Sequence, residues 1–139
     1  MNVDYYRDLL RTHGPTYRAV DAGSEYTHWL RHRLLCEMIE PPTASVLDVG
    51  CGVGHLTERL RPDQPYRGID ILPEMIAAAR AKYPAFHFEV GDIAEPKDSW
   101  QADYVLASGL FQFNSYHGIL KTLFRLCRKG VACNFLRTG

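Results

Sequence analysis

The residue types best suited to ligand chemistry gather in one short stretch, SVLDVGCGVGH, at positions 45–55. An apolar run carrying one acid, Asp48, leads into three glycines at alternate positions, Gly50, Gly52 and Gly54. Glycines after a strand let a ligand approach the backbone closely. The N–H groups of such a loop, with those at the start of the next helix, can hold an anionic group.

Two classes of ligand compete for a loop of this kind. In the dinucleotide fingerprint GxGxxG, the third glycine lets a helix pack beside a pyrophosphate. That position is His55 here, the third glycine comes one residue early, and the Asp48 carboxylate would face the diphosphate. The same carboxylate suits a ligand with an ammonium group, while the loop N–H groups hold a carboxylate. An amino-acid moiety carries both groups, so the loop favours it over a dinucleotide.

Two more acids follow the next two predicted strands. Asp70 stands twenty residues after Gly50, where an acid can accept hydrogen bonds from both ribose hydroxyls. Asp92 follows the third strand, where a carboxylate can accept from the exocyclic amine of adenine. The apolar residues expected to contact the ring are Ile71, Met75 and Ile93. An amino acid, a ribose and an adenine together describe S-adenosylmethionine (SAM).

The hydrophobic pattern predicts the elements that must position these residues. Short apolar runs predict strands at Val46–Val49, Tyr66–Asp70, Phe86–Val90, Asp103–Ser108 and Val131–Leu136. Helical spacing predicts helices at Asp4–Arg11, from Ser24 to about Ile39, at Leu56 and Leu60, from Pro73 to Tyr83, and from Tyr116 to Cys127, the last ending with Arg128, Lys129 and Gly130. This alternation predicts an α/β fold with a doubly wound, mostly parallel sheet of about five strands. Such sheets bind ligands beyond the carboxyl ends of their strands, which is where the acids stand.

Four motifs in order resemble those of the class I SAM-dependent methyltransferases. They are VLDVGCGVG, GIDILPEMI, FEVGDI and ADYVLASGLFQF, and the resemblance covers Ser45 to about Leu136. It implies a single domain, with a Rossmann-like methyltransferase core over residues 44–139 and an N-terminal helical lid over residues 1–43. The lid is similar to one found in a bacterial subset of the family.

The resemblance also implies roles for individual residues. An arginine at the position of Arg31 reaches the cofactor carboxylate, while Asp48 and Gly50 sit at the methionine end. Asp70 binds the ribose. Asp92 and Ile93 bind the adenine, and Ala107 and Ser108 line the methyl-transfer cleft. Cys51, inside the glycine loop, is expected to matter for its small size and not for its thiol.

The predicted reaction is transfer of the SAM methyl group to a small-molecule acceptor. Because the sulfonium already activates the methyl group, the protein mainly supplies position, and a general base is needed only by some acceptors. We assign no catalytic residue, and the candidates for a base are His13, Tyr17 and His28. Related enzymes continue the sheet beyond the fifth strand, so the alternative is a binding module for SAM or S-adenosylhomocysteine (SAH) without turnover. A nicotinamide oxidoreductase is the third choice, opposed by His55 and Asp48.

Composition sets the broad limits on partners. The 139 residues have zero formal net charge, which argues against a nucleic-acid partner, and they contain no apolar run long enough to span a membrane. Four scattered cysteines predict a cytoplasmic protein without a metal cluster. His28 and His32 are one helical turn apart, but no third ligand accompanies them, so no metal site is predicted.

Two expectations concern surfaces. The predicted fifth strand is apolar and lies at the edge of the sheet, so it or the preceding helix is predicted to form a homodimer. Two questions stay open: whether Phe111–Asn114 cover the substrate or pack under the next helix, and whether Tyr17, Tyr26 and Trp29 cage a substrate or pack between helices.

Overall fold

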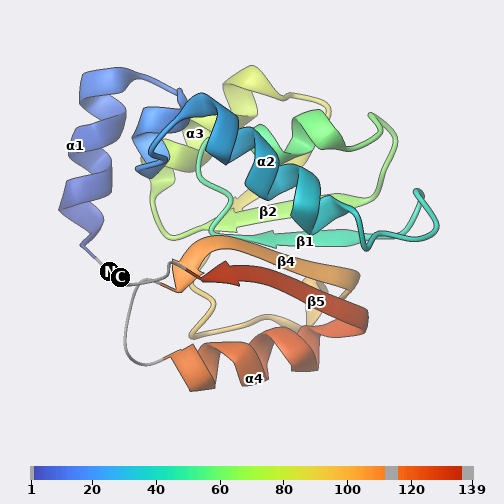
Figure 1. Ribbon diagram of the computed structural model, residues 1–139. Helices are drawn as coiled ribbons and strands as arrows, with labels where there is room; N and C mark the ends of the chain where they lie inside the picture. Colours follow the sequence, from blue (N-terminus) through green and yellow to red (C-terminus); the bar gives the residue numbers. More distant parts are fainter. Residues whose placement is uncertain (1, 112–115, 136–139) are drawn as a thin grey trace.

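The computed structural model describes residues 2–111 and 116–135. Five parallel strands form one sheet in the order β3-β2-β1-β4-β5 (Figure 1). The strands are β1 (Val46–Val49), β2 (Tyr66–Asp70), β3 (His87–Val90), β4 (Ala102–Phe111) and β5 (Cys127–Phe135). The strand order reverses at β1, where β2 and β4 leave on opposite sides. The predicted doubly wound α/β fold is therefore confirmed, and β1 marks the switch point at which such sheets bind ligands.

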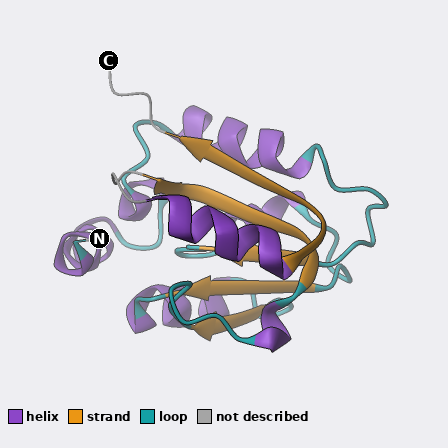
Figure 2. Cartoon of the chain, turned by 90° about the horizontal axis from the view of Figure 1, so that it is seen from below, coloured by secondary structure: helices purple, strands orange, loops and turns teal. Residues whose placement is uncertain are grey.

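Helices cover both faces of this sheet. They are α1 (Val3–His13), α2 (Glu25–Cys36), α3 (Pro73–Lys82) and α4 (Tyr116–Leu126), with short 3-10 turns η1 (Tyr17–Val20), η2 (His55–Arg59) and η3 (Asp98–Trp100). The view from below in Figure 2 shows α4 lying along one face. The helices α2 and α3 pack on the opposite face, and α1 contacts α3. Across the described residues, no helix has the length and apolar character needed to cross a membrane.

The alternation of side chains along β1 divides the core between the two faces. Leu47 and Val49 belong to a buried cluster completed by Leu123 and Leu126 of α4. Val46 belongs to a second cluster that includes Leu35 of α2. A strand buried on both faces reads as a continuous apolar run, which is why VLDV stands out in the sequence despite its central acid.

The start of β5 corrects one prediction. The segment Cys127–Gly130, expected to end the last helix, is strand, and Cys127 pairs with Ala102 of β4. Gly130 serves as a packing site instead of a helix cap, because a Cβ there would lie 2.7 Å from the end of the Met38 side chain.

Other boundaries differ by a few residues. The segment after the glycines is a 3-10 turn and not the predicted helix, since Leu60 already has extended backbone angles. The strand β4 continues three residues beyond Ser108, and η1 and η3 were not predicted. Leu136, the end of the predicted fifth strand, lies outside the described residues. Residues 112–114 do so as well, so the two roles considered for Phe111–Asn114 fall on a segment that the structure does not describe.

Candidate functional site

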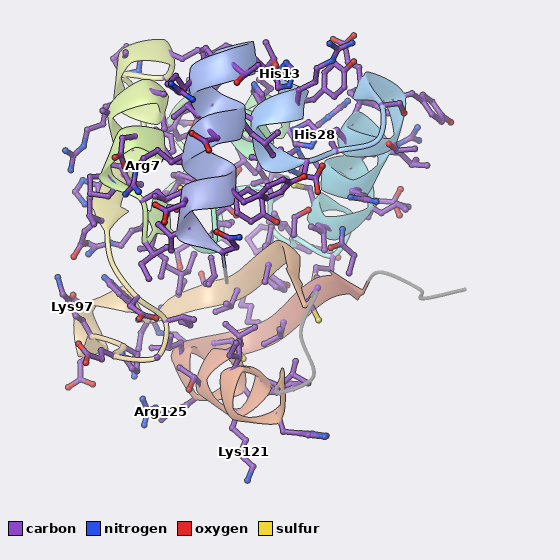
Figure 3. The ribbon with its side chains drawn as sticks, turned by 90° about the vertical axis from the view of Figure 1, so that its left-hand side faces the viewer. Arg7, His13, His28, Lys97, Lys121 and Arg125 are labelled. Carbon is purple, nitrogen blue, oxygen red and sulfur yellow. The ribbon has the colours of Figure 1, made fainter. Side chains whose placement is uncertain are left out.

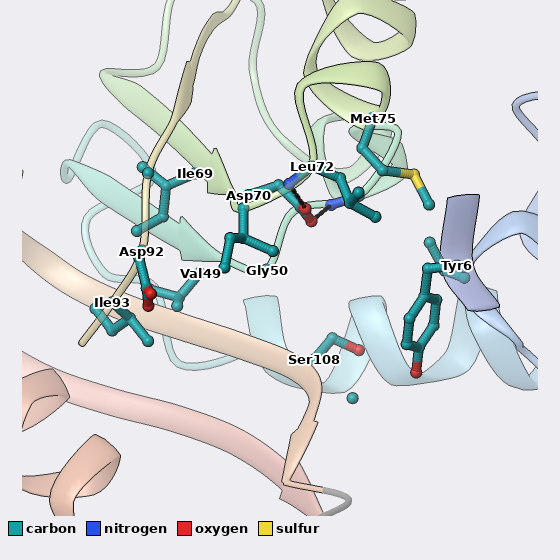
Figure 4. A pocket seen from close by; sticks show the side chains of 15 residues that line it. Tyr6, Val49, Gly50, Ile69, Asp70, Leu72, Met75, Asp92, Ile93 and Ser108 are labelled. Carbon is teal, nitrogen blue, oxygen red and sulfur yellow. Dashed lines mark hydrogen bonds between the residues drawn. The ribbon is translucent and has the colours of Figure 1, made fainter. Parts of the chain in front are cut away.

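A cavity opens at the carboxyl ends of β1, β2 and β4, with an open volume of about 720 Å³ (Figure 4). Eight residues predicted from the sequence line it, namely Gly50, Gly52, Asp70, Ile71, Met75, Asp92, Ile93 and Ser108. The structure therefore gathers residues from the loops after β1, β2 and β3, and from β2, β4 and α3 themselves, at the one edge where the prediction placed them.

Backbone donors hold the carboxylate of Asp70 at this cavity. One oxygen accepts from the N–H of Leu72 and the other from the N–H of Gly52, each at 2.9 Å. Burial raises the pKa of Asp70, while the hydrogen bonds from Leu72 and Gly52 act to lower it. Each oxygen keeps acceptor capacity, so the fixed carboxylate can receive further hydrogen bonds from a ligand.

The glycine loop is packed against η1. A Cβ on Gly52, whose φ is +55°, would lie 2.6 Å from a methyl carbon of Val20 in η1. The loop therefore needs glycine at this position both for its backbone conformation and for its contact with η1.

Asp92 is held in a turn of its own. Its carboxylate accepts from the N–H of Ala94 at 2.9 Å. The preceding Gly91 has no room for a Cβ, which would lie 2.5 Å from the ring of the buried Trp100. The Trp100 ring thus packs under the loop that begins at Gly91, and Asp92 lies at the cavity wall next to the buried Ile93.

A second, more polar cavity of about 620 Å³ adjoins the first and shares Gly50 and Ser108 with it. Arg31, Asp48 and Cys51 line this second cavity. Burial raises the pKa of the Cys51 thiol well above its usual value, and the Cys51 Cβ packs 3.0 Å from where a Cβ on Gly68 would lie. Its environment therefore favours a small neutral side chain. A guanidinium, a carboxylate and loop N–H groups around one space suit the charged end of an amino acid.

Asp48 is the most deeply buried acid of the site, with 2% of its surface exposed. The hydroxyl of Tyr66 donates to one of its carboxylate oxygens at 2.7 Å. The pKa of Asp48 is raised to about 7, mainly by burial and also by the nearby Asp70, against the lowering effect of the Tyr66 hydrogen bond. A carboxylate in this position is kept from full hydration until a ligand cation reaches it.

Three imidazoles form the outer wall of the second cavity. His28 Nε2 lies 3.0 Å from Nδ1 of His55, and the rings of His28 and His32 are 4.3 Å apart. Burial is the main cause that lowers the pKa of His28 to about 4 and that of His32 to about 3. These rings are therefore neutral near pH 7. In the described part of the chain, no group of three or more His, Cys, Asp or Glu side chains is arranged to hold a metal ion.

Some predicted residues lie elsewhere. Gly54 and Ala107 line neither cavity: a Cβ on Gly54 would lie 2.8 Å from the ring of Phe88, and Ala107 is fully buried in the core. Tyr17 lines a third cavity, together with Trp29 and the three histidines. His13 ends α1 and lines none of the three cavities described (Figure 3).

Seven residues that line the first cavity were not predicted as site residues, namely Tyr6, Val20, Val49, Ile69, Leu72, Gly91 and Gly109. Leu72, Gly91 and Gly109 lie within the quoted motifs and directly adjoin predicted residues, so including the neighbours of each predicted residue would have found them. Tyr6 and Val20 come from α1 and η1, and no spacing in the sequence connects them with the glycine loop.

With this geometry in view, the comparisons with known proteins identify the family. The sequence profile described as a methyltransferase domain matches residues 46–130. The chain therefore belongs to the methyltransferase domain family, and the resemblance seen in the four motifs is confirmed. The family is one of SAM-dependent enzymes.

Two relatives and two solved structures illustrate the similarity. A trans-aconitate 2-methyltransferase from Sinorhizobium medicae is 35% identical over 91 residues, or 63% of this chain and 35% of the relative. A malonyl-(acyl-carrier protein) O-methyltransferase from Priestia megaterium is 29% identical over 132 residues, or 90% of this chain and 48% of the relative. The chain thus spans about a third to a half of the length of these relatives.

Among solved structures, one chain comes from the complex between the Haloferax volcanii Trm112 methyltransferase activator and a methyltransferase. It matches with a TM-score of 0.69 and 25% identity, over 95% of this chain and 59% of that chain. The magnesium protoporphyrin IX methyltransferase of Synechocystis with bound SAH has a TM-score of 0.65 at 19% identity, over 89% of this chain and 67% of that chain, and so shares the fold.

The raised pKa of Asp48 makes stability depend on pH. Because the folded state holds the Asp48 proton up to about pH 7, this group stabilises the fold in acid, and that contribution is lost as pH rises through the folded pKa. Between about pH 5 and pH 8 the loss should be roughly 2–3 kcal/mol, taking 1.36 kcal/mol per pKa unit. Asp48→Asn keeps an acceptor for Tyr66 and removes the titration.

Urea unfolding of the parent and Asp48→Asn across this pH range measures the effect. We expect the stability of the variant relative to the parent to increase as pH rises. The histidines, whose pKa values are lowered, act in the opposite sense, but they are present in both proteins and cancel in the comparison. A constant difference between the two proteins at all pH values would show that Asp48 titrates normally.

Proposed function

We propose that the chain binds SAM across the two adjoining cavities and transfers its methyl group to a small-molecule acceptor. The observation that carries this proposal is the convergence of Asp48, Asp70 and Asp92, from three different strands, on one continuous edge. These acids meet the three polar parts of SAM in the order in which that molecule presents them.

The residues present fit the cofactor group by group. Asp70, fixed by two backbone donors, would accept from the ribose hydroxyls, and Asp92 from the adenine amine. Met75 and Ile93 offer apolar contacts to the ring. Asp48 and Arg31 would hold the ammonium and carboxylate. When bound, SAM supplies a methyl group activated by its sulfonium, so the task of the chain is to orient donor and acceptor and to exclude water.

The relatives suggest which acceptors to try first. Their names specify trans-aconitate and malonyl-(acyl-carrier protein), and both acceptors carry carboxylates. We therefore extend the proposal to a carboxylate-bearing acceptor. Such an acceptor needs no general base, which agrees with the low pKa of His28 at the cavity wall.

Asp70→Ala tests the ribose site. The variant should bind SAH about 10 to 150 times more weakly, because a hydrogen bond to a charged acceptor contributes about 1.5–3 kcal/mol. Calorimetry measures the affinity, and Asp63→Ala, which changes an exposed acid remote from the cavities, is the matched control. Unchanged SAH binding in Asp70→Ala would remove the ribose site. Tight SAH binding by the parent without transfer to any acceptor would favour the non-catalytic alternative.

We also propose that residues 1–43 act as a lid over the cofactor. Tyr6 of α1 and Val20 of η1 line the first cavity, although α1 contains no buried residue. An ion pair of 2.7 Å between Arg7 and Glu74 joins α1 to α3, and Figure 3 shows Arg7 beside α3. Both partners are half exposed, so the ion pair contributes little to stability and α1 is held mainly by packing.

Hydrogen exchange with and without SAH tests the lid. We expect added protection across residues 10 to 35, because ligand contacts order this segment. Residues 117–126 of α4, on the other face of the sheet, provide the internal control and should not change. Equal exchange across residues 10 to 35 in both states would exclude a lid.

The edge of the sheet supports a further proposal, a two-fold homodimer. The strand β5 pairs with β4 on one side, and no described strand pairs with its other side. Phe124, on the neighbouring α4, is 62% exposed. An unpaired edge beside an exposed aromatic residue favours association with a second copy.

Light scattering at micromolar concentration decides the oligomeric state. We expect a dimer mass for the parent and a shift toward monomer for Phe124→Glu, because a buried charge would disfavour the interface. Leu34→Glu is the matched control, since Leu34 is similarly exposed on the opposite face of the sheet. A monomeric parent that still binds SAH would show that the five-stranded sheet suffices alone.

We place this activity in the cytoplasm of a bacterial cell. The four cysteines are free thiols, as a reducing compartment requires, and the two relatives described above are bacterial.

A further inference from the structure

Tyr66 lies too early in β2 to belong to the rim of the cavities, yet its side chain reaches the cofactor site. It pairs with Val46, whereas Asp48 pairs with Gly68 two residues further along the ladder. The Tyr66 side chain spans this offset, because its hydroxyl donates to the Asp48 carboxylate at 2.7 Å. A residue from the core thus makes direct contact with the acid of the second cavity.

Gly68 makes this reach possible. Tyr66 and Gly68 share one face of β2, and a Cβ on Gly68 would lie 2.6 Å from the Tyr66 hydroxyl oxygen. The rings of Phe86 and Phe88 pack edge-on against Tyr66, with centroids 5.4 and 5.6 Å away. The ring is 9% exposed, so its hydroxyl has a fixed position.

We propose that Tyr66 is a positioning residue of the cofactor site, holding one oxygen of the Asp48 carboxylate so that the other is presented to the ammonium group of the ligand. The proposal rests on the proposed function, since it assumes that the second cavity receives the amino-acid end of SAM. It adds a residue that lines neither cavity and that the motifs did not indicate.

Ionisation of Asp48 should then control binding of the ammonium group near neutral pH. The groups around its carboxylate are Tyr66 and Asp70 of β2, Cys51 of the loop, and four residues of α2 with one of η2, namely His28, Arg31, His32, Cys36 and His55. The pKa values of all three histidines are lowered and those of Tyr66, Cys36 and Cys51 are raised. Since the Asp48 pKa is about 7, Asp48 changes charge there, while burial also raises the pKa of Asp70, which faces the first cavity.

The sign of the linkage follows from the ligand charge. An ammonium group binds the ionised carboxylate, so affinity for SAH should rise about tenfold between about pH 6 and pH 8. Removing the Tyr66 hydroxyl removes a hydrogen bond that lowers the Asp48 pKa, so Tyr66→Phe should move this rise to higher pH. At about pH 7 the variant should bind SAH several-fold more weakly, and the two affinities should approach each other at about pH 9.

Calorimetry with two ligands tests the proposal. SAH carries the ammonium group, whereas 5′-methylthioadenosine keeps the adenosine and lacks the amino-acid end. Binding of the second ligand should be independent of pH and unchanged in Tyr66→Phe. Tyr104→Phe is the matched control, because Tyr104 is another buried tyrosine whose hydroxyl donates to the backbone carbonyl of Glu40, away from the cavities.

Each outcome bears on the proposal. The same pH profile for SAH in the parent and Tyr66→Phe would overturn it, and so would an equal loss of both ligands in the variant. Should Tyr66→Phe fold poorly, Gly68→Ala replaces it, because its Cβ would lie 2.6 Å from the hydroxyl oxygen, and also 2.8 Å from the Phe88 ring, and its pH profiles for the two ligands are compared with those of the parent. Failure of the parent to bind either ligand would instead contradict the proposed function.

Discussion

The pairing of β1 with two parallel neighbours is the constraint on which the rest of the structure depends. Val49 lies level with Ile69 of β2 and with Ala107 of β4, so Gly50, Asp70 and Ser108 emerge at the same height. The register of β2 with β3 then sets Asp70 beside Val90, directly before the loop that carries Asp92. Residues far apart in the chain thus meet because the hydrogen-bond ladder aligns the ends of four strands.

The site accepts an energetic cost that the core does not require. Asp48 occupies a strand position where an apolar side chain would pack more favourably, and its burial disfavours the charged form. The surrounding residues offset only part of this cost, through one hydroxyl donor and the polar wall of the second cavity. Departures of this kind from the apolar pattern are typical of ligand sites, where the unfavourable group is stabilised by what it binds.

Local patterns were sufficient for much of this arrangement. The strands β1 and β2 and the helix α3 begin where the apolar runs and Pro73 predicted, and the acids at their ends were placed on the correct edge. The strand conformation of Cys127–Gly130 was not predicted, because pairing with β4 is a long-range interaction that terminal charges and a glycine do not reveal. The contacts of Tyr6, Val20 and Tyr66 with the site could not be predicted from the sequence either. They depend on how α1, η1 and the core side chains pack, which periodicity does not encode.

The pairing of Tyr66 with Gly68 has a consequence for how this sequence can change over time. A side chain at position 68 and a phenolic hydroxyl above it would occupy the same space, so neither position can vary alone without cost. A homologue with alanine or a larger residue at position 68 would need a shorter side chain at position 66. Its buried acid would then need another donor. Positions 66 and 68 are therefore expected to change together, because the absence of a side chain at Gly68 leaves the space that the Tyr66 hydroxyl occupies.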